Sequence, residues 1–267
     1  MEDKRRQTIR RESFKPPEAL WLAMILLCLW MGLGAGISAS AAENDSGQEP
    51  DADTVMIRVE AQAEEIDRDA LLERINAIRR EACEEGINNP VNGVPLTAED
   101  YVPLEWSYAL EEIAALRAAE STILQDHIRP DGRECFTAAP EGVSYTMETL
   151  AWGFGSAAEA VEGWYSEKSS YVEPDGSPAG HYMALINPGN RYVGIAQLRP
   201  QWQRNACAGA FGEHGGPGEP AEAEGDNDGE TVRMIPLKRE LLPSVIERAL
   251  ELTAGRIFKA AVKICMR

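Results

Sequence analysis

SYTMETLAWGFGSAAEAVEGWYSE, residues 144–167, predicts a strand, a turn and a helix in immediate succession. Residues 144–151 are predicted as a short strand, and the glycines of GFG then interrupt it. Ser156 and Glu159 form a capping box, in which side chains satisfy free backbone amides at the start of a helix. The predicted helix carries Val161, Trp164 and Tyr165. A strand that leads directly into a helix favours a mixed α and β fold.

Three apolar runs follow this stretch, and we predict them as strands. They cover residues 181–186, 192–198 and 205–211, with NPGN and RPQ as the turns between them. Because short turns join antiparallel strands, the sheet is expected to be mostly antiparallel.

Two amphipathic helices are predicted before the stretch. Leu71, Ile75, Ile78 and Ala82 recur at helical spacing, and Gly86 would end this first helix. The second is expected to begin near Glu105 and to run towards His127, with the apolar residues Trp106, Leu110, Ile113, Leu116 and Ile123. The order of elements predicts an α+β layered domain over residues 67–213.

Four segments flank this predicted domain. Residues 1–41 combine a basic flank with an apolar run from Ala19 to Ile37. An acidic linker is expected at 42–66, although Val55 to Val59 could add an edge strand. Residues 214–230 form a Gly, Pro and acid-rich linker, and 231–267 a tail of unknown role with a possible short β segment.

The N-terminal segment predicts export. Its apolar run is followed by Ala39-Ser40-Ala41, which fits the pattern of a signal-peptidase site, so cleavage near Ala41 is expected. The alternative is an uncleaved anchor, because nineteen apolar residues almost span a bilayer core of about 30 Å. In both cases the rest of the chain is expected to be extracellular or at the cell surface.

Charge and composition exclude some classes of protein. The 267 residues are 44% hydrophobic and 26% charged, which is typical of a globular domain. The formal charge of −18 argues against nucleic acid as the main partner. Any contact with a membrane is expected only through the N-terminal segment, and the extracellular ligand or protein partner is unknown.

Cysteine usage argues against a metal knuckle and leaves disulfides or plain buried thiols as the alternatives. Once the N-terminal segment is set aside, Cys83, Cys135, Cys207 and Cys265 remain, and none of them forms a CxxC pair. We favour a bridge between Cys135 and Cys207, which would fasten the loop beside His127 to the sheet.

Two histidines and two glutamates carry the predicted chemistry. His127 ends one element and His181 opens another, so both side chains can reach a cleft. Glu148 lies inside an apolar strand, where a carboxylate needs a partner, and Glu167 lies near the end of a helix.

These residues lie in motifs that resemble a known family. HIRPDGR, METLAWG, AVEGWYSEKSSY, GHYMALINP and VGIA occur in the order found in the CAP superfamily of cysteine-rich secretory, antigen 5 and pathogenesis-related 1 proteins. The HxRPDG form is that of its bacterial SCP-domain branch. The resemblance covers about residues 70–213, and Asn76 with Arg79 or Arg80 agrees with it.

The resemblance implies a three-layer α-β-α sandwich and a cleft lined by His127, Glu148, Glu167 and His181. The two histidines would be ligands of Zn2+ or another divalent metal, bound weakly, and the two glutamates would orient them. The chain departs from the family where Met147-Glu148-Thr149 replaces Gly-Glu-Asn, which changes the shape of the cleft but keeps the carboxylate.

Several functions fit these residues. The preferred one is an exported CAP-domain binding or interaction module with a metal-binding cleft. A metal-dependent secreted hydrolase is the alternative, with Glu148 and Glu167 as the catalytic candidates, although no nucleophile is matched to a base. The same four residues could instead form a purely structural polar network in an adhesive module.

Overall fold

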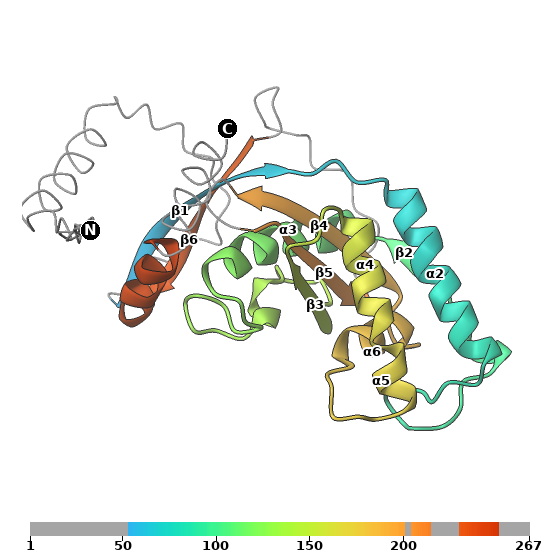
Figure 1. The fold of residues 1–267 in the computed structure, drawn as a ribbon. Coiled ribbons are helices and arrows are strands. Elements are labelled where there is room, and N and C mark those ends of the chain that lie inside the picture. The colour runs from blue at the N-terminus through green and yellow to red at the C-terminus, as the bar shows by residue number, and fades with distance from the viewer. Residues whose placement is uncertain (1–52, 201–203, 215–229, 251–267) are drawn as a thin grey trace, which may run out of the picture. The chain divides into compact units, whose positions relative to one another are not determined.

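The computed structural model describes residues 53–200, 204–214 and 230–250 (Figure 1). The signal or anchor predicted at 1–41 lies outside these residues, as does the cysteine at position 265. Among the described helices, none is both long and apolar enough to cross a membrane.

One sheet organises the described chain. Its six strands are β1 (Thr54–Ala63), β2 (Glu105–Trp106), β3 (Met147–Trp152), β4 (Tyr192–Pro200), β5 (Ala206–Gly212) and β6 (Glu230–Lys238). The order is β3-β5-β4-β1-β6, and all of these neighbours are antiparallel. Only β2 pairs in parallel, with β4. The expectation of a mostly antiparallel sheet is therefore confirmed.

Five labelled α-helices connect or cover the strands. They are α2 (Arg68–Glu84), α3 (Tyr108–Ile123), α4 (Ala157–Ser166), α5 (Lys168–Val172) and α6 (Gly180–Ile186). Short 3-10 turns occupy Ala98–Asp100, Cys135–Ala138 and Arg239–Leu241, and residues 242–250 are helical. The three longest helices begin at side-chain caps, in which Asp67, Ser107 and Ser156 each accept a hydrogen bond from a backbone amide.

Two apolar clusters lie on opposite faces of the sheet and make the three layers. On one face, α2, α4 and α6 pack against side chains such as Ala151, Ile195 and Phe211. On the other face, α3 packs against side chains such as Leu150 and Ala208. Successive residues of a strand point to opposite faces, so Leu150 and Ala151 belong to different clusters. The three-layer α-β-α sandwich is confirmed.

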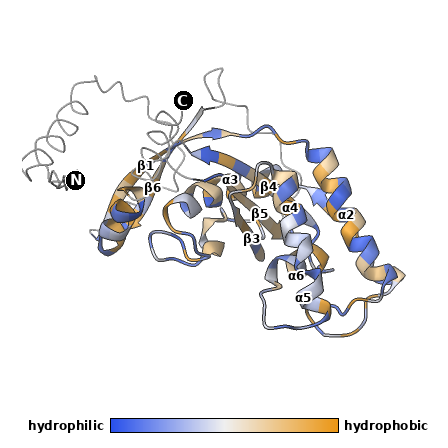
Figure 2. Ribbon diagram, viewed as in Figure 1, coloured by the Kyte–Doolittle hydropathy of each residue, from blue (hydrophilic) through white to orange (hydrophobic). Residues whose placement is uncertain are grey.

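Hydrophobic spacing correctly predicted α2. Figure 2 shows apolar and polar residues alternating along this helix, and its four periodic apolar residues, Leu71, Ile75, Ile78 and Ala82, are all buried. These residues belong to one cluster with α4 and α6. Burial of the stripe is the main source of this helix's stability, because isolated helices of such length are marginal in water.

Two local predictions were wrong. The run at 181–186 is not a strand but most of helix α6, because a short continuous apolar run fits a buried helix as well as a buried strand. Trp106 does not lie on the second helix, since α3 starts only at Tyr108 and Trp106 belongs to β2. Its indole Nε1 donates to Glu111 at 2.8 Å.

The flanks of the predicted domain contribute two strands. β1 lies within the segment 42–66, where an edge strand was one of the two expectations, but it is an interior strand between β4 and β6. β6 lies in the tail. The two strands pair over nine positions, from Thr54 with Lys238 to Gln62 with Glu230. Beyond the pairing, Lys238 donates its backbone N–H to the carbonyl of Pro130 at 2.9 Å, so the tail contacts the HIRPDGR loop.

Candidate functional site

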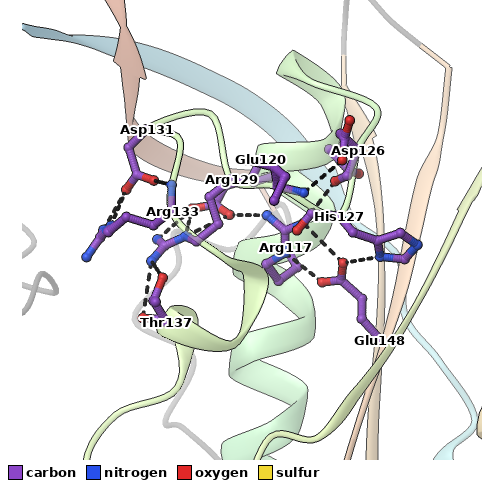
Figure 3. A network of polar contacts seen from close by, with 12 residues as sticks. Arg117, Glu120, Asp126, His127, Arg129, Asp131, Arg133, Thr137 and Glu148 are labelled. Atoms are coloured by element: carbon purple, nitrogen blue, oxygen red, sulfur yellow. Dashed lines mark hydrogen bonds and ion pairs between the residues drawn. The ribbon is translucent and has the colours of Figure 1, made fainter.

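The first histidine is paired with a buried glutamate. His127 follows α3, and its Nδ1 lies 2.7 Å from Oε1 of Glu148 on β3 (Figure 3). Its side chain is 56% exposed, whereas that of Glu148 is only 2% exposed. The carboxylate therefore orients the ring from beneath, and Nε2 is the ring nitrogen left for a ligand.

Arg117 of α3 holds the same carboxylate from within the protein. Its Nε donates to Oε2 of Glu148 at 2.6 Å, and its Nη2 donates to Oε1 at 3.1 Å. Tyr145 also donates its hydroxyl to Oε2. Nη2 further reaches the carbonyl oxygens of Asp126 and His127, at 3.0 and 3.3 Å. Arg117 thus fixes both the glutamate and the backbone that carries the histidine.

The network continues into the HIRPDGR loop. Glu120 accepts from Nη1 of Arg117 at 2.5 Å and from Nη2 of Arg129 at 2.6 Å. Arg129 also donates to the carbonyl and hydroxyl oxygens of Thr137. This buried network contains two arginines and two glutamates, so its charges balance. Buried charges are tolerated away from water only when they are paired in this way.

These surroundings shift several pKa values. Burial raises the pKa of the Glu148 carboxyl, but the hydrogen bonds from His127 and Arg117 outweigh burial and lower it overall. The hydrogen bond to Glu148 raises the pKa of His127, against a smaller opposing effect of burial. Burial would lower the pKa of Arg117, but its carboxylate partners raise it. The network therefore keeps Glu148 ionised at neutral pH.

The second histidine has its own glutamate. His181 lies in the first turn of α6, and its Nδ1 is 2.6 Å from Oε1 of Glu167, which follows α4. The other oxygen, Oε2, accepts from the backbone amides of His181 and Tyr182 at 2.9 and 3.3 Å. Glu167 thus caps α6 at the end where an anion is favoured, and it orients the imidazole as well.

The two pairs are built on different faces of the sheet. Glu148 points towards α3, whereas Glu167 and His181 lie on the side of α4 and α6. Across the described part of the chain, no group of three or more His, Cys, Asp and Glu side chains is placed to hold a metal ion. Among the described residues, the two pairs leave only the imidazole Nε2 atoms as candidate metal ligands, with no third protein ligand beside them.

Helix α2 supports this site from the other end of α6. Arg79 is buried and donates to the carbonyl oxygens of Leu185 and Asn187 at 2.8 and 2.9 Å. Burial lowers its pKa to about 10. Of the two arginines that the sequence offered, the structure selects Arg79, because Arg80 is exposed and stacks on Tyr101.

The expected disulfide between Cys135 and Cys207 is absent. Within the described residues, Cys83, Cys135 and Cys207 are all unbonded thiols. Cys135 belongs to the cluster under α3, whereas Cys207 belongs to the cluster on the opposite face. The sheet separates the two side chains, so the proposed bridge is wrong for a geometric reason.

Sequence reasoning identified both histidine–glutamate pairs but missed Arg117, Glu120 and Arg129. A signal for two of them was present. Arg117 and Glu120 continue the spacing of the buried residues Leu110, Ile113 and Ala114 on α3. Charged residues on an apolar stripe indicate a buried polar network, because a buried charge requires a partner.

Comparison with sequence families gave one match. A sequence model described as the cysteine-rich secretory protein family, CAP, matches residues 72–199. No curated protein matched the sequence.

Three solved structures are similar at low identity. NaASP2 with Zn2+ is 15% identical with a TM-score of 0.41, covering 60% of this chain and 84% of that one. An outer surface protein from Borrelia burgdorferi is 18% identical with a TM-score of 0.37, covering 57% and 98%. Venom allergen-like protein 4 from Schistosoma mansoni is 15% identical with a TM-score of 0.39, covering 58% and 95%. Residues 72–199 of this chain therefore match the CAP family model.

Proposed function

We propose that this chain is an exported CAP-domain binding module, in which His127 and His181 present imidazole nitrogens to a divalent metal or to an extracellular partner. The observation that carries the proposal is that both rings are bonded to a glutamate through Nδ1, at 2.7 and 2.6 Å. This arrangement fixes the tautomer of each ring and leaves Nε2 for the ligand. The basic flank, apolar run and Ala39-Ser40-Ala41 support export.

The donor set limits the strength of metal binding. A protein metal site usually has three or four protein ligands, and these two histidines supply two nitrogens. We therefore expect weak binding of Zn2+, which as a bound ion would supply Lewis acidity and open coordination positions. Because metal and proton compete for the imidazoles, affinity should fall as the pH falls through the raised pKa of His127.

Binding is a better interpretation than hydrolysis, because neither glutamate is free to act as a base. Both oxygens of Glu148 are engaged by His127, Arg117 and Tyr145. Both oxygens of Glu167 are engaged by the ring and backbone of His181 and by the amide of Tyr182. A general base must reach the proton that it removes, and these carboxylate oxygens already accept hydrogen bonds from other groups of the protein.

Calorimetric titration of the full chain with zinc chloride tests the proposal. The single variants His127→Ala and His181→Ala and the double variant are compared, with His214→Ala as the matched control. If the histidines share one ion, either single variant removes the binding. If each ring binds alone, every single variant halves the stoichiometry. Equal binding by the double variant would refute the metal proposal, and binding lost in the control would place the ion elsewhere.

A further inference from the structure

The outer edge of β6 contacts the HIRPDGR loop. Strand β6 forms one edge of the described sheet and lies outside the family-matched residues 72–199. In an antiparallel ladder, alternate residues of an edge strand turn their amides away from the neighbouring strand. Lys238 has this orientation, because its N–H donates to the carbonyl oxygen of Pro130 rather than to β1. Pro236, two residues earlier, shares the orientation, so it costs the ladder no hydrogen bond.

This contact fixes the loop at a buried point. Pro130 is buried, and the backbone nitrogen of Lys238 lies 2.9 Å from its carbonyl oxygen. The side chain of Lys238 lies against Gly132, where an added Cβ would be 2.7 Å from Nζ. A buried carbonyl that loses its donor is costly, because water does not replace the lost hydrogen bond. The tail strand therefore determines where Pro130 lies.

The loop is a closed turn, so a shift at one residue carries the others with it. The N–H of Arg129 donates to the carbonyl oxygen of Arg133 at 2.9 Å. The N–H of Gly132 donates back to the carbonyl oxygen of Arg129 at 2.8 Å. Arg129 also precedes Pro130 directly in the chain. Movement of Pro130 away from β6 would therefore move Arg129.

Arg129 connects the loop to the first histidine–glutamate pair. Its Nη2 and Nε donate to Oε1 of Glu120 at 2.6 and 2.9 Å (Figure 3). Glu120 also accepts from Arg117, and Arg117 bonds both oxygens of Glu148, the partner of His127. None of the four side chains between the loop and the imidazole is more than 6% exposed. The connection from β6 to the ring is thus continuous and shielded from water.

We propose that β6 positions His127 through these contacts, so that the hydrogen bond from Lys238 to Pro130 sets how tightly the histidine site holds its ligand. The part that concerns the ligand rests on the proposed function, whereas the positioning does not. Lys238 acts at a distance as a positioning residue. The second pair, on the side of α4 and α6, should not respond, because it is supported by Arg79, which bonds the carbonyl oxygens of Val102 and Leu185.

A proline at position 238 removes the hydrogen bond with little strain. Proline fixes φ at about −65°, and Lys238 already has a φ of −56°. The preceding residue lies in a strand, which suits a residue before proline. Lys238→Pro therefore deletes the N–H and keeps the backbone shape. Lys238→Ala is the matched control, since it removes the side chain and keeps the N–H, and circular dichroism checks that both variants fold.

Hydrogen exchange of arginine Nε–H groups, measured by NMR on the full chain, tests the positioning. The Nε–H groups of Arg117 and Arg129 donate to buried carboxylates, and that of Arg79 donates to a carbonyl oxygen beside α2. In Lys238→Pro, exchange at Arg117 and Arg129 should become roughly tenfold faster, with Arg79 unchanged. Unchanged exchange at Arg117 and Arg129 would overturn the proposal. So would equal acceleration at Arg79, which indicates general destabilisation, or equal acceleration in Lys238→Ala.

Calorimetry with zinc chloride tests the effect on the histidine site. Lys238→Pro should bind zinc roughly fivefold more weakly than the wild type, and Lys238→Ala should bind it equally well. Equal affinity in Lys238→Pro would overturn the proposal, because the loop would then not act on the site. A wild type that binds no zinc would refute the proposed metal binding, and the exchange measurement would then decide the positioning alone.

Discussion

Arg117 bonds both carboxylate oxygens of Glu148, with Nε 2.6 Å from Oε2 and Nη2 3.1 Å from Oε1, and neither side chain is more than 2% exposed. Arg117 therefore acts on the site through Glu148 rather than by contact with a ligand. The orientation of His127 at the surface thus depends on Arg117, which is buried and out of reach of a ligand.

Replacement of Arg117 should lower the free energy of unfolding of the domain. In Arg117→Leu, Glu120 and Glu148 lose a buried partner, so we expect a loss of about 3–5 kcal/mol in the free energy of unfolding. Urea unfolding at neutral pH measures it. Arg80→Leu is the control, because Arg80 is exposed, and its loss should stay under about 1 kcal/mol. Similar losses in both variants would show that the buried network does not stabilise the fold.

The pairing with Glu148 should be visible in the titration of His127. In Glu148→Gln the carboxylate that raises the pKa of His127 is gone, so the pKa should fall towards its ordinary value. NMR titration of the ring protons measures the shift. Glu167→Gln should leave His127 unchanged, since that carboxylate bonds His181. A pKa of His127 that does not move would mean that the pair is not formed in solution.

The same pair predicts a dependence of stability on pH. A raised pKa in the folded state means that the His127 contribution is present below the ordinary histidine pKa and is lost as pH rises through the raised value. Glu148 behaves in the opposite way, and its contribution is lost as pH falls through the lowered pKa. We measure the urea unfolding midpoint at pH values around the pKa of His127. In Glu148→Gln, the part of the pH dependence that comes from His127 should disappear. The same pH dependence in this variant and in the wild type would contradict the pairing of His127 with Glu148.

A close approach of two backbones fixes α3 against the sheet. A Cβ added at Gly194 of β4 would lie 2.0 Å from the backbone nitrogen of Glu111. Because backbone cannot rotate aside, Gly194→Ala should cost about 3 kcal/mol or more. Gly180→Ala is the matched control, since no atom lies within 4 Å of a Cβ there. Thermal unfolding compares the two, and an equal effect would mean that α3 does not lie this close to β4.

The described cysteines should remain thiols in the folded protein. Burial raises the pKa of Cys135 to about 11 and raises that of Cys207 further, so both should react slowly in the folded protein. Alkylation after denaturation without reductant, followed by mass spectrometry, should find Cys83, Cys135 and Cys207 all modified. A crosslinked peptide that joins Cys135 to Cys207 would contradict the structure.

The order of layers could be predicted from the sequence because most elements carry their own local signal. The apolar spacing of α2, the capping serine of α4 and the turns between the later strands each depend on neighbouring residues only. The 181–186 run failed because it is short and apolar throughout, so neither period dominates. Whether such a run forms a helix is decided by its contacts, here by Glu167 at its start and Arg79 at its end.

The candidate site was predictable only in part. The family motifs identified His127, Glu148, Glu167 and His181, but not the faces of the sheet on which each pair lies. For Glu148 that placement follows from the direction of a single strand residue, which reverses with a shift of one position. The contact of β6 with the HIRPDGR loop was not predictable either, because it joins two segments that are far apart in the sequence.

The pairing of β1 with β6 also has a consequence for synthesis of the chain. β1 is made well before β6, its partner over nine positions, so this part of the sheet can form only after β6 has been made. A nascent or truncated chain that stops before β6 leaves the unpaired amides and carbonyls of β1 open to other chains. Premature termination before β6 should therefore produce an aggregating species rather than a merely shortened protein.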